Sequence, residues 1–232
     1  MTLENWYLRN KPRIMREIKF AIPRYKKFLV QAYGMGVAKI VVQETLQRFE
    51  DLLPDLPYIG GDENILTENL YLSAAMLAMY QSLKARGKSV EEVAGLIYQG
   101  TSKFYTSFPF RLLLLWQGRQ LFSQKRLDQR RHDAAISQAR RYPEDWVFEI
   151  VEGDGQSFQF GVDYTECGIV KYLTRQGAPE LAPYLCWLDY PMCAAMRVKL
   201  FRTETIAQGC EKCNFRFSRG QALDVKPDFL KN

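Results

Sequence analysis

The sequence predicts an α+β fold, with a helical N-terminal half packed on a C-terminal antiparallel sheet. Two observations lead to this class. Up to about residue 142 the apolar residues recur with helical spacing, and from about Pro143 they alternate as in strands. The second half has the order β-β-α-α-β-β, which is typical of an antiparallel sheet with helices on one face. We therefore expect a helical region over residues 1–142 and an α+β region with the cysteine motifs over residues 143–232, together forming one compact unit.

Two helices of the first half have recognisable ends. Residues 67–86 are apolar around most of the helical circumference, which predicts a buried helix that ends at Gly87. The next helix is expected to begin at Ser89, because Ser89 and Glu92 have the spacing of a capping box. The stretch 53–64 before them contains prolines and glycines, which predict an ordered loop.

Two pairs of strands are predicted in the second half. The first pair is expected near 146–150 and 158–162, because apolar residues alternate there and the sequence EGDGQ between them is a hairpin turn signal. The second pair is expected at 197–207 and 213–218, joined by the sequence GCEKC. This arrangement places a Cys-x-x-Cys pair in a turn between two strands.

Two helices are predicted between these strand pairs. Asp163 and Glu166 have the spacing of a helix start, so the first helix is expected over 164–176 and is closed by Gly177. The second helix has leucines on one face and is expected to end at Pro191, since proline cannot continue a helix.

The composition indicates a cytoplasmic protein. The N-terminus lacks the apolar core of a secretory signal, and the longest aliphatic run, LLLLW at 112–116, is far shorter than the roughly 20 residues of a membrane span. No membrane partner is therefore expected. The five cysteines lie between Cys167 and Cys213. In a reducing compartment such thiols stay free, bind a metal or react.

The net charge of +6 is concentrated in two basic runs. Residues 1–27 hold eight basic side chains against two acidic ones, and residues 119–141 hold seven against two. Such runs can face phosphate or an anionic substrate, but solvated helix sides explain them better, and nucleic acid is an unlikely partner without a recognised binding motif. The single histidine, His132, argues against a Ser-His-Asp triad or a histidine-rich metal centre, and we expect it at the surface.

Cys167, Cys186 and Asp189 are candidate chemical groups. Cys167 would lie in the first turn of a helix, where free backbone amides favour a thiolate and lower the thiol pKa. Alternatively it is a small buried apolar residue that packs with Val170. Cys186 and Asp189 are three residues apart, so on a helix they share a face. Asp189 could then act on a substrate or cap the following turn.

Arg202 is a candidate clamp for a substrate carboxylate. In the predicted strand it shares a face with Val198 and Leu200, and its planar guanidinium suits bidentate contact with a carboxylate. Alternatively this face is solvated, or Arg202 pairs only with Glu204.

The Cys-x-x-Cys pair of Cys210 and Cys213 has the shape of a zinc knuckle, but a structural zinc needs four ligands. The other cysteines could complete such a set, although they lack a second pair with this spacing. Cys213 alternates with Phe215 and Phe217. We therefore expect its thiol on the apolar face of the sheet, with Cys210 incidental.

Three segments resemble the L-2-amino-thiazoline-4-carboxylic acid hydrolase family. They are DYTEC (163–167), PYLCWLD (183–189) and RTETIAQGCEKCNFRF (202–217). The matching positions are Glu166, Cys167, Cys186, Asp189, Arg202, Thr203, Thr205, Gly209, Cys213 and Phe215. The resemblance covers roughly residues 55–218 and is most specific in the C-terminal third. Asn214 stands where the family usually has aspartate, which leaves open whether the substrate is the family's own.

The resemblance implies a hydrolase that opens the ring of a small cyclic amidine or amide-type carboxylate at a C–N bond. Our mechanistic hypothesis on this basis assigns Arg202 to the substrate carboxylate, Asp189 as general base for water or a thiol, and Cys186 or Cys213 as nucleophile. The remaining implied substrate contacts are Thr205, Cys167 and Glu166. No metal ligand is assigned, and the cofactor and homo-oligomeric state are left open. The alternative is a cysteine-rich module that binds a ligand or metal without turnover.

Overall fold

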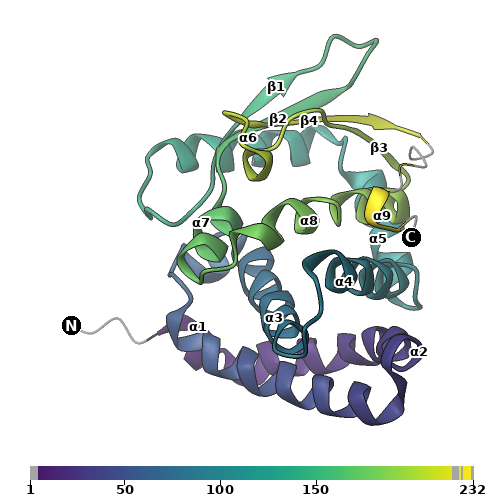
Figure 1. The fold of residues 1–232 in the computed structure, drawn as a ribbon. Coiled ribbons are helices and arrows are strands. Elements are labelled where there is room, and N and C mark those ends of the chain that lie inside the picture. Colours follow the sequence, from purple (N-terminus) through teal and green to yellow (C-terminus); the bar gives the residue numbers. More distant parts are fainter. Residues whose placement is uncertain (1–4, 221–224, 226, 231–232) are drawn as a thin grey trace.

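Helices make up the first part of the chain in the computed structural model, which describes residues 5–220, 225 and 227–230 (Figure 1). They are α1 (Trp6–Arg9), α2 (Lys11–Leu52), α3 (Thr67–Lys84), α4 (Val90–Tyr105), α5 (Phe110–Gln120) and α6 (Gln124–Gln138). The predicted buried helix corresponds to α3. The predicted capping box opens α4, where Ser89 and Glu92 each accept a hydrogen bond from the other's backbone amide.

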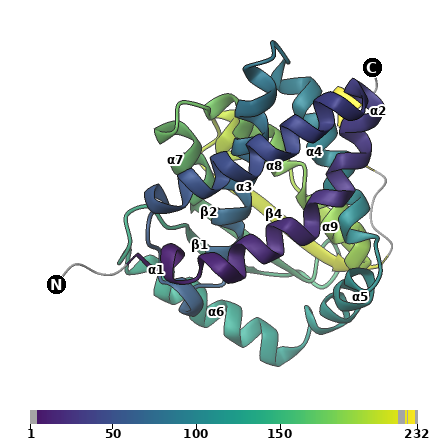
Figure 2. The same cartoon turned by 90° about the horizontal axis from the view of Figure 1, so that it is seen from below.

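The long helix α2 is divided by Gly34 into two arms (Figure 2). Gly34 has φ 79° and ψ 165°, a backbone conformation that glycine adopts far more readily than other residues. The second arm brings the chain back to α1, where the Tyr7 hydroxyl donates a hydrogen bond to the Pro57 carbonyl at 2.9 Å. The loop predicted at 53–64 follows and contains two short 3₁₀ turns, at Leu53–Asp55 and Gly61–Glu63.

The C-terminal half forms a four-stranded antiparallel sheet. Its strands are β1 (Val147–Glu152), β2 (Phe160–Glu166), β3 (Val198–Phe201) and β4 (Cys213–Arg219), in the spatial order β1-β2-β4-β3. On one face of the sheet, Phe160 and Val162 of β2 lie opposite Phe217 and Phe215 of β4. The α+β class predicted from the sequence is confirmed.

Short helices fill the space between the sheet and the long helices (Figure 1). They are α7 (Gly168–Arg175), α8 (Ala182–Cys186) and α9 (Asp189–Met196). Figure 1 shows the sheet at one end of the molecule, α7–α9 beneath it, then α3 and α4, with α1 and α2 at the opposite end. Helices α7, α8 and α9 therefore have the sheet on one side and the long helices on the other.

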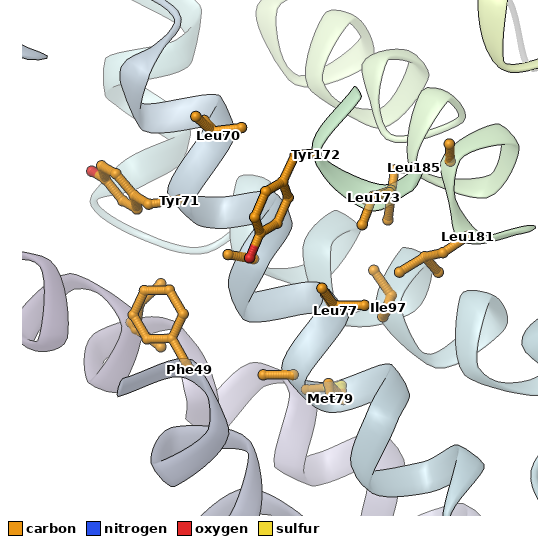
Figure 3. Packing of buried hydrophobic residues seen from close by; sticks show 14 of the residues in the cluster. Phe49, Leu70, Tyr71, Leu77, Met79, Ile97, Tyr172, Leu173, Leu181 and Leu185 are labelled. Carbon is orange, nitrogen blue, oxygen red and sulfur yellow. The ribbon is translucent and has the colours of Figure 1, made fainter. Parts of the chain in front are cut away.

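Leu77 of α3 belongs to the buried apolar cluster that joins these layers. Its side chain has no exposed surface. Figure 3 shows it facing Ile97 of α4, with Phe49 of α2 and Tyr172 of α7 in the same cluster. Residues from both halves of the chain thus pack into one core.

Three boundaries predicted from the sequence are wrong. Asp163 and Glu166 lie in β2 and do not start a helix, since their segment pairs with β4 and β1. The strand expected over 197–207 ends at Phe201. Pro191 lies in the first turn of α9, where the missing amide proton costs no helical hydrogen bond, so it does not end a helix.

Among the described residues, the helices are either too short or too polar to cross a lipid bilayer. His132 lies exposed on α6, as predicted.

We expect the substitution Leu77→Ala to lower the free energy of unfolding by about 2–5 kcal/mol, because it opens a cavity in a closely packed core. Urea unfolding followed by circular dichroism measures this change. Leu112→Ala is the matched control: the Leu112 side chain is 57 % exposed, so its loss should alter stability by no more than about 0.5 kcal/mol. Equal effects of the two substitutions would contradict the packing described for α3.

Candidate functional site

Arg202 is a buried cation at the junction of the sheet and the short helices. It follows β3, and its side chain is 5 % exposed. Its Nη1 donates to Asp189 Oδ2 at 2.7 Å, and its Nη2 donates to the Cys186 carbonyl at 2.8 Å. Both alternatives considered from the sequence, a solvated face and pairing of Arg202 with Glu204 alone, are wrong. Val198 and Leu200 on this face are buried, and the ion-pair partner of Arg202 is Asp189.

Aromatic rings flank the guanidinium of Arg202. Its Cζ lies 4.8 Å from the ring centroid of Phe215 and 5.4 Å from that of Tyr190. The electron-rich ring faces attract a cation, and they also keep water away from it. Arg202 is thus held as a charged group in surroundings of low polarity.

The corner between α8 and α9 supplies both partners of Arg202. Cys186 is the last residue of α8 and Asp189 is the first of α9, so the prediction that they share one helix face is wrong. The chain turn brings them together instead. Carbonyls at a helix end have no partner inside the helix, which leaves that of Cys186 free to accept from Arg202.

Asp189 is the more accessible member of the ion pair, because its side chain is 33 % exposed. Burial raises the pKa of Asp189, and the nearby charge of Arg202 offsets only part of that effect. A carboxylate with a raised pKa is a stronger base than an ordinary aspartate.

The thiols around this pair are buried or half-buried, and their surroundings favour the protonated form. Burial raises the pKa of Cys167 to about 11, because loss of hydration outweighs the amides of Val170 and Ile169 that stabilise a thiolate. The predicted lowering of this pKa is therefore wrong. Cys167 also lies one residue before α7, as its N-cap, and not inside its first turn. Burial likewise raises the pKa of Cys213, whose Sγ accepts a hydrogen bond from the Ile206 amide at 3.2 Å.

The charges of Asp189 and Arg202, and any charge on the thiols, influence one another. Burial raises the pKa of Cys186, Arg202 opposes this rise, and negative charge on Asp189, Cys167 or Cys213 would add to it. These groups come from four separate segments: the end of β2, the α8–α9 corner, the chain after β3 and the start of β4. All five cysteines of the chain are free thiols.

Glu166 and Thr205 are engaged in local contacts. Glu166 forms ion pairs with Arg140 and Lys171 at the end of β2. Thr205 is buried, and its hydroxyl donates to Gln208 Oε1 at 2.9 Å, which holds the turn before Cys210. The structure therefore places Thr205 at the start of that turn and Glu166 in a separate charged cluster.

Asn214 holds the backbone next to Arg202. Its Oδ1 accepts hydrogen bonds from the amides of Thr203 and Glu204, both at 2.9 Å, and its Nδ2 donates to Thr203 Oγ1 at 2.8 Å. A carboxylate could accept the same two amide hydrogen bonds. The difference from the family's usual aspartate is thus compatible with a structural role at this position.

The cysteines do not assemble a set of metal ligands in the part of the chain that the structure describes. There, no three or more histidine, cysteine, aspartate or glutamate side chains come together in a way that could hold a metal ion. Cys213 lies buried at the start of β4, whereas Cys210 is half-buried in the preceding turn. The expectation that the Cys213 thiol shares a face with Phe215 agrees with the strand register.

A pocket of about 300 Å³ lies between the 59–66 loop and the end of α6, and neither Arg202, Asp189 nor any cysteine lines it. Its apolar wall includes Trp146 and Phe148, and its charged groups include Arg141 and Asp145. The indole of Trp146 also interacts with Cys167, so this residue connects the pocket to the cluster. From the sequence, residues 53–64 were predicted only to form an ordered loop. The pocket could not be predicted, because its walls come from segments far apart in the chain and leave no local sequence pattern.

Comparison with known proteins identifies one family. The family model described as L-2-amino-thiazoline-4-carboxylic acid hydrolase matches residues 68–217, more than half of the chain. The three motif segments found in the sequence all lie inside this match. No curated protein and no solved structure matches the chain.

We expect Asn214→Leu to lower the free energy of unfolding by about 1–3 kcal/mol, because two backbone amides lose their acceptor. The amides of Thr203 and Glu204 should also exchange with deuterium faster. Asn214→Asp is the matched control, and it should keep both amides protected. Equal exchange in the two variants would contradict the positioning role of this side chain.

Proposed function

Because this chain belongs to the L-2-amino-thiazoline-4-carboxylic acid hydrolase family, we propose that it hydrolyses a C–N bond in the ring of a small cyclic amidine carboxylate. The observation that supports this most directly is the buried Arg202 guanidinium, held beside the Asp189 carboxylate. A guanidinium fork suits a substrate carboxylate, and a neighbouring base suits the activation of water. L-2-amino-thiazoline-4-carboxylate, which the family name prints, is the first substrate to test.

The proposed reaction consumes one water molecule. The water oxygen bonds to the amidine carbon, and the bond from that carbon to the ring nitrogen breaks. The carbon keeps its sulfur and its exocyclic nitrogen and becomes a carbonyl. Both water protons end on the released ring nitrogen, which leaves as an amine. The product is an open chain that is one water heavier than the substrate.

In this mechanism Arg202 orients the substrate and Asp189 removes a proton. The substrate approaches from the exposed side of Asp189, and its carboxylate takes the place of Asp189 on the guanidinium. Asp189 is then free to accept a proton from water. Its raised pKa makes it a stronger base than an ordinary aspartate. Cys167 and Thr205 are proposed to line the substrate, whereas Glu166 is already engaged with Arg140 and Lys171.

We favour attack by water over attack by a thiol. A cysteine nucleophile reacts as its thiolate, and burial raises the pKa of Cys186 and of Cys213. Asp189 would have to deprotonate either thiol before it could attack. Cys186 and Cys213 remain the candidates if a covalent intermediate forms, in which case the intact protein gains the mass of the substrate during turnover.

Mass spectrometry of purified protein with L-2-amino-thiazoline-4-carboxylate tests the proposal through the appearance of the hydrated product. Arg202→Gln should lower kcat/KM by about 100-fold or more, because it removes the charge that binds the carboxylate. Arg141→Gln, the same substitution in the neighbouring pocket, is the matched control and should change kcat/KM less than about 3-fold.

The opposite pattern, with loss in Arg141→Gln and none in Arg202→Gln, would move the site to the pocket. Substrate binding without product, measured by calorimetry, would favour the alternative of a binding module without turnover. If the protein neither binds this substrate nor forms product from it, this substrate is excluded from the proposal.

The pH dependence of kcat/KM separates water attack from thiolate attack. A base acts when it is deprotonated, so the rate should rise with pH through the pKa of Asp189. Because burial raises that pKa, the rise in kcat/KM should occur at a pH above 3.8, the ordinary pKa of aspartate. The substitution Asp189→Asn should abolish this rise in kcat/KM with pH and should remove most of the activity. A rate that instead climbs in the alkaline range would indicate a thiolate nucleophile, because burial raises the pKa of both Cys186 and Cys213 above that of an ordinary thiol.

A further inference from the structure

The exposed side of α5 carries several large apolar side chains. Leu112 is 57 % exposed, Leu113 44 % and Trp116 50 %, and Phe108, two residues before the helix, is 78 % exposed. Leu112 and Trp116 are one helical turn apart, and Leu113 lies beside them. Exposed apolar side chains are ordinary when they are scattered, but a contiguous group of this kind marks an interaction surface.

The orientation of α5 is fixed by its inward face. Leu114 is buried, and Gly118 packs directly on the end of α9, where an added Cβ would lie 2.0 Å from the Met196 carbonyl oxygen. Any larger residue at this position would therefore collide with backbone. The helix cannot rotate to bury Leu112 and Trp116 without losing this contact. Figures 1 and 2 both show α5 at the periphery of the molecule.

The surroundings of this face are positively charged. From Val93 to Leu127 the sequence contains no aspartate or glutamate. It contains five basic residues there, all exposed: Lys103, Arg111, Arg119, Lys125 and Arg126. None of them forms an ion pair with another residue that the structure describes. Basic residues that have no ion-pair partner within the described part of the chain thus precede, follow and interrupt the apolar residues of α5 in the sequence.

We propose that the α5 face binds the surface of an anionic lipid bilayer. Phenylalanine, leucine and tryptophan side chains enter the boundary between headgroups and acyl chains, and neighbouring lysines and arginines bind anionic headgroups. Surface binding needs exposed apolar side chains and no membrane-crossing length, and Leu112, Leu113 and Trp116 meet this need. This proposal departs from the expectation of no membrane partner, and it does not depend on the proposed hydrolase activity.

Charge and surface chemistry favour lipid over two other occupants. A second copy of the chain on the same face would bring two sets of uncompensated cations together, which opposes association. A nucleic acid would satisfy the cations but would leave Leu112 and Trp116 without an apolar partner. An anionic bilayer offers both complementary charge and an apolar interior.

Co-sedimentation of the full chain with vesicles tests the proposal. Vesicles of phosphatidylcholine with about one-third phosphatidylglycerol should bind the protein at least about 10-fold more tightly than phosphatidylcholine alone, and added salt should weaken this binding. The double variant Leu112→Ser/Trp116→Ser should lose about 10-fold or more in affinity. The double variant Arg119→Gln/Lys125→Gln should reduce the preference for anionic vesicles.

The matched control is Met35→Ser/Ile40→Ser, which removes two comparably exposed apolar side chains from α2. It should keep vesicle affinity within about 2-fold of the unsubstituted protein. The proposal is overturned by absence of binding to anionic vesicles, or by equal loss in the control. It is also overturned if light scattering shows a dimer that Leu112→Ser/Trp116→Ser dissociates, because the occupant would then be a second copy. All substituted positions are exposed, and urea unfolding verifies that each variant folds.

Discussion

The burial of one guanidinium sets the arrangement of the C-terminal half. A buried arginine must be paired, because an isolated charge in surroundings of low polarity is strongly unfavourable. Arg202 obtains a carboxylate from the start of α9 and a carbonyl from the end of α8. The α8–α9 corner is therefore tied to the chain that follows β3, and Asn214 of β4 fixes the backbone of that same segment. Removing either partner would leave charge without compensation.

This constraint also determines the chemistry available nearby. The same low polarity that strengthens the ion pair raises the pKa of the surrounding thiols. Cysteines that the sequence suggests as nucleophiles are thus protonated, and the group best prepared to move a proton is Asp189. In the reaction proposed above, water therefore attacks the ring carbon and no thiol forms a bond to it.

The charged interior contrasts with the surface around α5, where exposed apolar side chains lie near basic residues that form no ion pair with the described residues. Gly118 connects the two, since its contact with the end of α9 places α5 firmly against the short-helix layer. The same contact turns Leu112 and Trp116 outward. A rigid helix that presents such residues is suited to a surface partner, and it does so on an element distinct from the Arg202 cluster.

The sequence by itself determined those features that depend on local spacing. The apolar circumference of α3, the capping box at Ser89 and the alternation in β2 and β4 each follow from residues close along the chain. Features that depend on contacts between distant segments were decided only by the tertiary structure. The helix expected at Asp163 became a strand because β4 and β1 pair with it. The pKa of Cys167 rose because burial outweighs the helix amides, and burial is a property of the whole fold.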